Sequence, residues 1–440
     1  MPDATPFHLS VAPALVAFRP ELEHACRFVA AAHGLTFTSG DGVALHYGDN
    51  PPAGAVANPA RILPAGTTLR ADGIHPDRAK LQNLFSDSGL TGPLIDDVAD
   101  VATETDSVPY DALGMIFLMI SRVEERSPDT TDRHGRFRYA DSVFPHLGGP
   151  AIPWADVAAR RLAGAILKTG NPPCAGSYRI VLTHDVDRLK GHHTISAALR
   201  EVAGDAVKRM NPARAARTFA RSFLGGDPWS SMDDIMTWAE AKNLTSKFFF
   251  IGPSRDPKDS PYAATMPDLL RTCADRIRAR GHGIGFHPGY ATFDDAETWV
   301  AQKRGLESVL GATLTEGRQH VLRYDIARTP VIWEHAGMET DYTLCFPEAA
   351  GFRTGSCRDV AAYDLVGRES MSLRYVATAI TDFGLLGKEY EGRSPDDAIA
   401  HCKSIAAQVR TFAGNLCILY HSGNRDPIQR SFYRALMDTV

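Results

Sequence analysis

The sequence lacks the cysteine pattern of a structural zinc site or a disulfide scaffold. Its seven cysteines are scattered along 440 residues and include no Cys-x-x-Cys pair. An odd and scattered set of this kind is typical of a protein kept in a reducing compartment. The zinc-ribbon and thioredoxin-like classes are therefore excluded, and we predict a cytoplasmic location.

Basic charge and long apolar runs are missing as well. The net charge is −5 at pH 7, whereas a general nucleic-acid binder is usually basic, so we predict no nucleic-acid partner. The most apolar stretch, residues 112–120, is too short to cross a bilayer, so we expect no membrane span. The first residues have neither a basic stretch nor a long apolar core, and we expect no signal peptide.

What is present divides the chain into two halves with different patterns. The first half is rich in Ala and Pro and alternates strand-like with helix-like segments, at residues 43–47, 61–64, 110–126 and 154–168. Pro and Gly at residues 170–176 interrupt both periodicities and indicate a linker. We therefore expect an N-terminal α/β accessory domain of unknown role over residues 1–172 and a second domain over 176–440.

The second half has the regular alternation of a parallel α/β sheet. Strand-like runs occur at residues 178–183, 247–252, 283–287, 320–324, 341–346, 373–380 and 416–421. Helical patterns separate most of them, although none is clear between the fifth and sixth runs. Seven such strands predict a parallel sheet, either open or closed into a barrel.

Polar residues with ligand chemistry follow five of these predicted strands. The strand ends carry His184-Asp185-Val186-Asp187, His287 with Tyr290 close behind, Arg323, Asp382 and His421. In a (β/α) barrel, catalytic groups collect at the C-terminal ends of the strands. Strand alternation places Asp185 and Asp187 on one side and His184 on the other. Carboxylates with imidazoles suit zinc or another divalent transition metal, and this combination indicates metal-assisted hydrolysis.

The motifs LTHDVD, GHGIGFHPGY and LYHSGN, with an arginine after the fourth strand, resemble the NodB-homology polysaccharide deacetylases of carbohydrate esterase family four. The resemblance covers about residues 176–440. The segments FLMISRVEER and DRHGRF look like the extra N-terminal domain of a divergent branch of that family. The resemblance implies a distorted seven-stranded (β/α) barrel, one divalent metal that is most often zinc, and removal of acetyl groups from sugars.

The resemblance also implies a role for each motif residue. Asp185 matches the catalytic base, Asp187 and His287 match metal ligands, Arg323 matches the arginine paired with the base, His421 matches the catalytic acid, and Asp382 matches the aspartate that orients it. The family's second histidine ligand falls at Ala291, so one ligand is missing. We leave open whether His184, Tyr290 or water replaces it, or whether metal binding is weakened or lost.

Several residues have a structural interpretation beside the functional one. His184 is a third-ligand candidate, yet it could equally pack behind the sheet. His320 could be a buried core residue within its predicted strand. Tyr290 and Arg353 are candidates for binding the substrate, although Arg353 could instead bridge two loops. The basic segment 188–223 is either a solvated helix pair or a lid that binds an anionic polymer.

The sequence therefore favours a metal-dependent hydrolase that removes an acyl group from an amino sugar or a glycan precursor. The alternative is a degenerate barrel that binds saccharide without catalysis, since the histidine at position 291 is absent. An amidohydrolase-type binuclear barrel ranks lower, because the first strand has no His-x-His and no bridging lysine is present.

Overall fold

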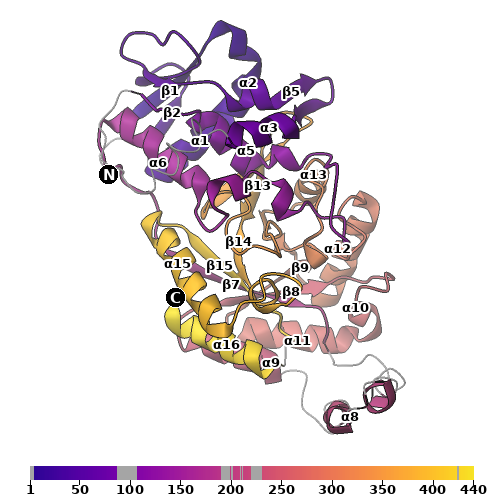
Figure 1. The fold of residues 1–440 in the computed structure, drawn as a ribbon. Helices are drawn as coiled ribbons and strands as arrows, with labels where there is room; N and C mark the ends of the chain where they lie inside the picture. The colour runs from indigo at the N-terminus through magenta and orange to yellow at the C-terminus, as the bar shows by residue number, and fades with distance from the viewer. Residues whose placement is uncertain are drawn as a thin grey trace. The chain divides into compact units, whose positions relative to one another are not determined.

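The computed structural model describes residues 4–86, 107–189, 199, 202–208, 210, 212–219, 230–423 and 426–440 (Figure 1). The chain forms two compact units. The first comprises Met1–Ile180, Val321–Ile418 and Val440, and the second comprises Val181–His320 and Leu419–Thr439. The expected accessory domain over residues 1–172 therefore stays a prediction, and each unit is described by itself.

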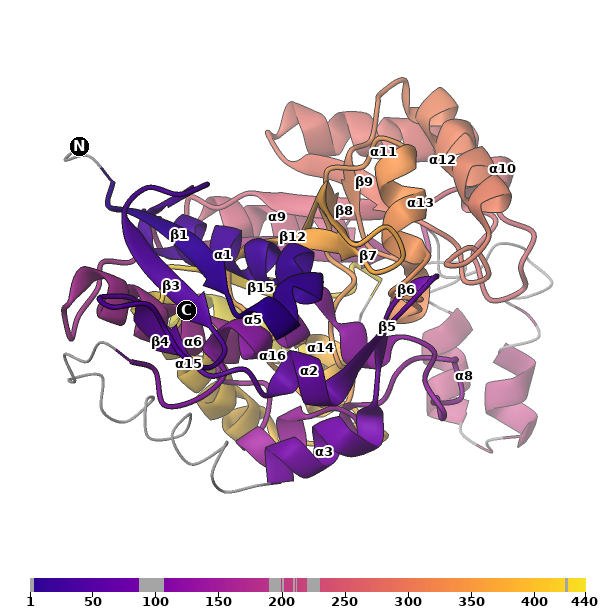
Figure 2. The same ribbon diagram turned by 90° about the horizontal axis from the view of Figure 1, so that it is seen from above.

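The first unit begins with a four-stranded parallel sheet in the order β2-β1-β3-β4. Its strands are β1 (Pro6–Val11), β2 (Thr36–Thr38), β3 (Val43–Tyr47) and β4 (Val56–Asn58). Helices α1 (Arg19–His33), α5 (Ala112–Ser121) and α6 (Trp154–Leu167) pack on one another, and Figure 2 shows α1 beside β1 and β3. Every residue of α5 is buried, which explains its uninterrupted apolar sequence. The predicted strand at 43–47 and the predicted helix at 154–168 are confirmed.

The expected strand at residues 61–64 is wrong, because these residues begin helix α2 (Ile62–Gly66). The carboxylate of Asp111 accepts hydrogen bonds from the amides of Arg61 and Ile62, at 2.8 and 2.7 Å. The same side chain caps α5 by accepting from the amide of Gly114. A buried, distant carboxylate thus fixes a helical start that the local sequence does not reveal. An antiparallel pair, β5 (Thr67–Arg70) and β6 (Gly73–Pro76), and helix α3 (Arg78–Ser86) follow.

The later part of the first unit differs from the predicted strand pattern. Its strands are β11 (Thr340–Asp341), β12 (Asp359–Asp364), β13 (Glu369–Val376), β14 (Thr378–Thr381) and most of β15 (Asn415–Leu419). Its helices are α13 (Thr329–His335), α14 (Asp382–Leu386) and α15 (Pro395–Thr411). Strand β12 pairs with β13 in antiparallel fashion, which explains why no helix pattern precedes the sixth predicted strand.

The second unit has the predicted alternation of strands and helices. Its strands are β7 (Arg179–Val186, of which all but the first two residues lie in this unit), β8 (Ser246–Ile251), β9 (Gly283–His287) and β10 (Glu316–Gly317). Its helices include α9 (Ser230–Glu240), α10 (Tyr262–Thr265), α11 (Pro267–Ala279), α12 (Ala296–Leu310) and α16 (Pro427–Thr439). These four strands pair in parallel with one another, in the order β7-β8-β9-β10.

The register of these strands brings their carboxyl ends to one edge. Val186 pairs with Phe250, Ile251 with His287, and Phe286 with Gly317. A Cβ atom at Gly317 would lie 2.0 Å from the Phe286 carbonyl oxygen, so only glycine lets β10 lie this close to β9. The residues that follow β7, β9 and β10 therefore meet at the same edge of the sheet.

The larger sheet has nine strands among the described residues, in the order β12-β13-β11-β10-β9-β8-β7-β15-β14, where seven were predicted. The predicted strand at residues 320–324 is wrong: a short 3-10 helix, His320–Leu322, occupies it, with φ of 59° at Val321. About half of the basic segment 188–223 falls outside the described residues, and the described pieces include α8 (Pro212–Phe219). Within the described ranges, no helix has the length and apolar character needed to cross a bilayer.

Candidate metal centre

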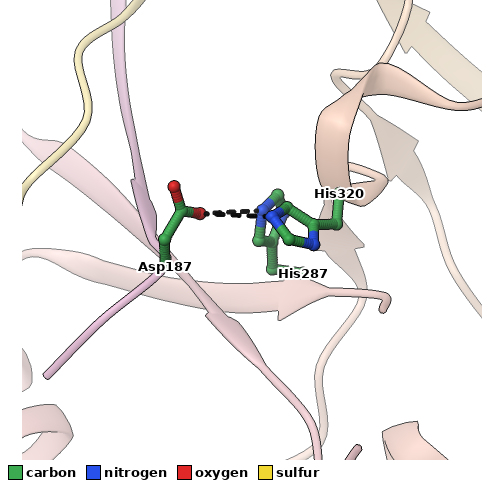
Figure 3. A group of neighbouring side chains, drawn as sticks. All are labelled: Asp187, His287 and His320. Carbon is green, nitrogen blue, oxygen red and sulfur yellow. Dashed lines mark ion pairs between the residues drawn. The ribbon is translucent and has the colours of Figure 1, made fainter. Parts of the chain in front are cut away.

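Three potential metal ligands meet at the carboxyl edge of the strands in the second unit. Asp187 directly follows β7, His287 is the last residue of β9, and His320 comes three residues after β10. Oδ1 of Asp187 lies 3.4 Å from Nε2 of His287 and 3.8 Å from Nε2 of His320. Figure 3 shows the carboxylate facing both rings. The three ligand atoms lie within 4.8 Å of one another.

The geometry and the missing hydrogen bonds fit a divalent cation. Oδ1 of Asp187 and Nε2 of His287 are buried, and neither has a hydrogen-bond partner. Such buried polar atoms are costly unless something binds them. Ligand atoms around a tetrahedral zinc, each at 2.0–2.1 Å from the ion, are about 3.3 Å apart. The two separations from Oδ1 of Asp187, 3.4 and 3.8 Å, are close to this value, and three protein ligands would leave one position open.

Both histidines are held so that Nε2 faces the cluster. Nδ1 of His287 donates to the Arg318 carbonyl oxygen at 2.5 Å, and Nδ1 of His320 donates to Oδ1 of Asp259 at 2.6 Å. Metal-binding histidines commonly donate their second ring N–H to a carbonyl or carboxylate in this way. The arrangement fixes the tautomer that leaves the Nε2 lone pairs available.

A second carboxylate, Asp185, lies beside the cluster and is paired with an arginine. Nη1 of Arg318 donates to Oδ1 of Asp185 at 2.7 Å, and Nη2 donates to Oγ1 of Thr183 at 2.7 Å. Oδ2 of Asp185 lies 3.8 Å from Nε2 of His287. Burial alone would raise the pKa of Asp185, but the charges of Arg318, His287 and His421 hold it below its usual value. Asp185 is therefore an ionised group next to the cluster.

The charges at the cluster also point to a cation. Burial would raise the pKa of Asp187, but the adjacent His287 ring and the charges of His421 and His320 hold it well below its usual range. Burial would lower the pKa of His287, but Asp185 and Asp187 raise it. The two carboxylates thus create a negative field that favours a positive charge between them, which a metal ion would supply.

Arg318 occupies the place that the sequence assigned to Arg323. In the first unit, Nε of Arg323 donates to the carbonyl oxygen of His134 at 2.8 Å. The misassignment follows from the misplaced strand, since β10 ends at Gly317 and the arginine after it is Arg318. The motif RQH at residues 318–320 thus contributes both an arginine and a histidine to the site.

His184, predicted as a possible third ligand, lies on the other side of the strand from the cluster. Its Nδ1 donates to the Tyr420 carbonyl oxygen at 2.9 Å, and its Nε2 is 3.1 Å from Oγ of Ser246. Both ring nitrogens are occupied, and the residue is fully buried. His184 therefore has the structural role that the sequence allowed, a buried residue packed behind the sheet. His320 takes the third position instead, although the sequence suggested a core residue there.

Three other predicted site residues are His421, Asp382 and Tyr290, and each has different contacts. His421 follows β15, and its charge lowers the pKa of both Asp185 and Asp187. Asp382 is buried at the first residue of α14, where its Oδ1 accepts from the amide of Phe383 at 3.0 Å, and its role toward His421 stays a prediction. The amide of Tyr290 donates to Oδ1 of Asp259 at 2.9 Å, and the Tyr290 ring lies under Lys258.

Arg353 is buried within the first unit, contrary to its expected contact with substrate. Its Nε and Nη2 donate to the two carboxylate oxygens of Glu125 at 3.0 and 2.5 Å, and its Nη1 donates to the Cys345 carbonyl oxygen. Only 1% of the Arg353 side chain is exposed. The guanidinium thus forms an internal ion pair. This role resembles the alternative in which Arg353 bridges two loops.

The fold and the site define a mixed α/β protein with an Asp-His-His cluster at one sheet edge. A family of unknown function, DUF7033, matches residues 16–171. A comparison with curated proteins finds no match.

Several solved structures have a distant likeness to this fold. A family 4 carbohydrate esterase from Streptomyces lividans, in complex with acetate, is 12% identical with a TM-score of 0.29, over 60% of this chain and 88% of its own. A polysaccharide deacetylase from Bacillus cereus is 13% identical with a TM-score of 0.27, over 59% and 86%. A peptidoglycan deacetylase from Bdellovibrio bacteriovorus is 14% identical with a TM-score of 0.29, over 60% and 53%. These scores are too low to support a function.

Proposed function

We propose that this protein is a metal-dependent hydrolase that removes an acetyl group from an amino sugar or a glycan precursor. The observation that carries the proposal is the Asp187, His287 and His320 cluster beside the ion pair of Asp185 and Arg318. The motif order noted in the sequence supports the sugar substrate. Zinc is the ion we propose, since one carboxylate and two imidazoles form a common catalytic zinc set.

Each residue of the site has a separate role in the proposed hydrolysis. A divalent metal held by Asp187, His287 and His320 would polarise the acyl carbonyl and make a nearby water more acidic. Asp185, kept ionised by Arg318, accepts the proton of the water that attacks the carbonyl carbon. His421 donates a proton to the departing amine or hydroxyl as its bond to the acyl carbon breaks. The products are acetate and the free sugar amine or hydroxyl.

The cluster favours this reaction over a barrel that only binds saccharide. That alternative was based on the missing histidine at Ala291, and His320 supplies a third ligand atom from another segment. Asp185, which a binding site does not need, is also buried and charge-paired beside the cluster. The accessory role of residues 1–172 and the cytoplasmic location remain predictions from the sequence.

Acetate release tests the proposal directly. Metal-loaded protein would be incubated with N-acetylated and O-acetylated sugars and oligosaccharides, and free acetate would be measured over time. We expect release by the wild type, loss by Asp187→Ala, and unchanged release by Asp256→Asn, a half-buried aspartate in the loop after β8. Undiminished release by Asp187→Ala would refute the assignment. Metal-loaded wild type that binds saccharide without releasing acetate would instead support the non-catalytic alternative.

A further inference from the structure

The third ligand of the cluster is held by a carboxylate from a segment distant in sequence. Asp259 lies in the loop between β8 and α10, 61 residues before His320. We propose that Asp259 is a positioning residue that makes His320 a metal ligand, and that it thereby compensates for the alanine at position 291. The inference rests on the proposed function, because it assumes that the cluster holds a metal.

Asp259 is itself fixed on both carboxylate oxygens. Oδ1 accepts hydrogen bonds from Nδ1 of His320 at 2.6 Å and from the amide of Tyr290 at 2.9 Å. Oδ2 accepts from Oγ of Ser254 at 2.6 Å. Only 1% of its side chain is exposed. A carboxylate held this firmly sets the orientation of the imidazole and raises the basicity of its other nitrogen.

The loop after β9 is built around this carboxylate. A Cβ atom at Gly289 would lie 2.3 Å from Oδ2 of Asp259, so the close approach of the carboxylate requires glycine. The amide of Gly289 donates to Oε1 of Gln302 at 2.9 Å, and its carbonyl oxygen accepts from Nε2 of Gln319 at 2.8 Å. The side chain of Ala291 is exposed. The loop therefore contributes a backbone donor to Asp259 where the related motif would contribute a ligand.

The backbone around His320 is irregular. Val321 and Leu322 both have φ of 59°, in the left-handed region that β-branched and bulky residues rarely adopt. The ring of His320 stands on a short 3-10 turn, not on a strand that would fix its direction. The hydrogen bond to Asp259 supplies that direction from outside the turn.

A double-mutant cycle on metal binding tests the proposal in the full chain. Zn²⁺ affinity would be measured for metal-free wild type, Asp259→Asn, His320→Ala and the double variant. Asparagine keeps the size and one accepting oxygen but removes the charge. We expect Asp259→Asn to weaken Zn²⁺ binding about 10- to 100-fold. In the His320→Ala background the same change should have almost no further effect, because Asp259 acts through His320.

Two further variants and one spectrum separate positioning from folding. Asp256→Asn removes a charge from the same loop, and Ser254→Ala removes one hydrogen bond from Asp259. We expect unchanged affinity for the first and a smaller loss for the second. The visible spectrum of Co²⁺-loaded Asp259→Asn should resemble that of His320→Ala, with one nitrogen ligand fewer.

The inference would be overturned by Asp259→Asn binding Zn²⁺ as tightly as the wild type. It would also be overturned by an equal loss in the His320→Ala background, since Asp259 would then act on the fold of the loop. Failure of the proposed function looks different: the wild type and Asp256→Asn would then bind no Zn²⁺ at all.

Discussion

Asp185 and Arg318 form an ion pair that is closed to solvent, with Nη1 of the arginine 2.7 Å from Oδ1 of the aspartate. The arginine side chain is fully buried, and only 4% of the aspartate side chain is exposed. The guanidinium also lies over the ring of Phe249, 5.3 Å from its centroid. A buried pair of this kind keeps the carboxylate ionised without exposing it to water, which suits a base in a hydrolase.

Removing the arginine should therefore damage both stability and catalysis. Arg318→Ala leaves a buried carboxylate unpaired, and we expect the free energy of unfolding to fall by about 3–5 kcal/mol. Acetate release should fall as well, because the pKa of Asp185 rises when its partner is lost. Arg323→Ala is the matched control and should leave acetate release near that of the wild type. Urea unfolding and acetate release, measured on the same samples, check both parts.

His184 and His320 should differ in their effect on metal binding. Both rings are buried, but only His320 directs Nε2 at Asp187. We expect His184→Gln to lower stability, because two hydrogen bonds are disturbed, yet to keep one bound metal per chain. Elemental analysis of purified protein checks this, with the melting temperature as the measure of folding. Loss of metal in folded His184→Gln would return His184 to the ligand set.

Arg353 should matter for stability and not for substrate affinity. Glu125 accepts from Arg353 and also from Arg122, whose Nε lies 2.8 Å from Oε1. Burial alone would raise the pKa of Glu125, but the charges of the two arginines hold it below its usual value. We expect Glu125→Ala and Arg353→Ala each to cost about 3–5 kcal/mol in urea unfolding. A stable Arg353→Ala with a raised KM would contradict this and support substrate contact.

A buried histidine of the first unit, His33, should make folding sensitive to acid. Burial lowers the pKa of His33 to about 4, while its Nδ1 donates to the Pro173 carbonyl oxygen. Because the folded state favours the neutral ring, the stabilisation is complete above pH 6.5 and is lost as the pH falls from 6.5 to about 4. A shift of this size corresponds to about 3 kcal/mol.

Replacing this histidine should flatten the acid dependence of stability. His33→Asn keeps a donor toward Pro173 but cannot take up a proton in this range. We expect the unfolding free energy of the variant to vary less with pH between 4 and 6.5 than that of the wild type. Exposed His335 provides the control, and His335→Asn should retain the wild-type slope. Equal slopes for all three proteins would show that His33 does not couple folding to pH.

The local sequence pattern was sufficient to predict which residues lie at the ends of the longer strands. β7, β8 and β9 are apolar runs whose alternation is visible in the sequence, and Asp187 and His287 follow from where β7 and β9 end. The separation of His184 from Asp185 and Asp187 also follows from alternation alone. These residues come together in the structure because parallel strands end at one edge of the sheet.

The rest of the site depends on contacts that no local pattern contains. β10 has only two residues, too few to produce a periodic sequence pattern. The role of Arg318 was therefore assigned to Arg323, five residues later. His320 was interpreted as a core residue. Asp259 contacts His320 across 61 residues, and Arg353 contacts Glu125 across 228. In both cases the sequence shows a charged residue in a loop, and only packing decides whether it meets solvent or a partner.

The metal content of purified protein tests the central claim most directly. Protein prepared without chelator and reloaded with Zn²⁺ would be measured as wild type, His287→Ala, His320→Ala and the control His335→Asn. We predict about one ion per chain for the wild type and the control, and loss of tight binding in the two ligand variants while both remain folded. A wild type that holds no ion after reloading, or a His320→Ala variant that binds as tightly as the wild type, would contradict the account.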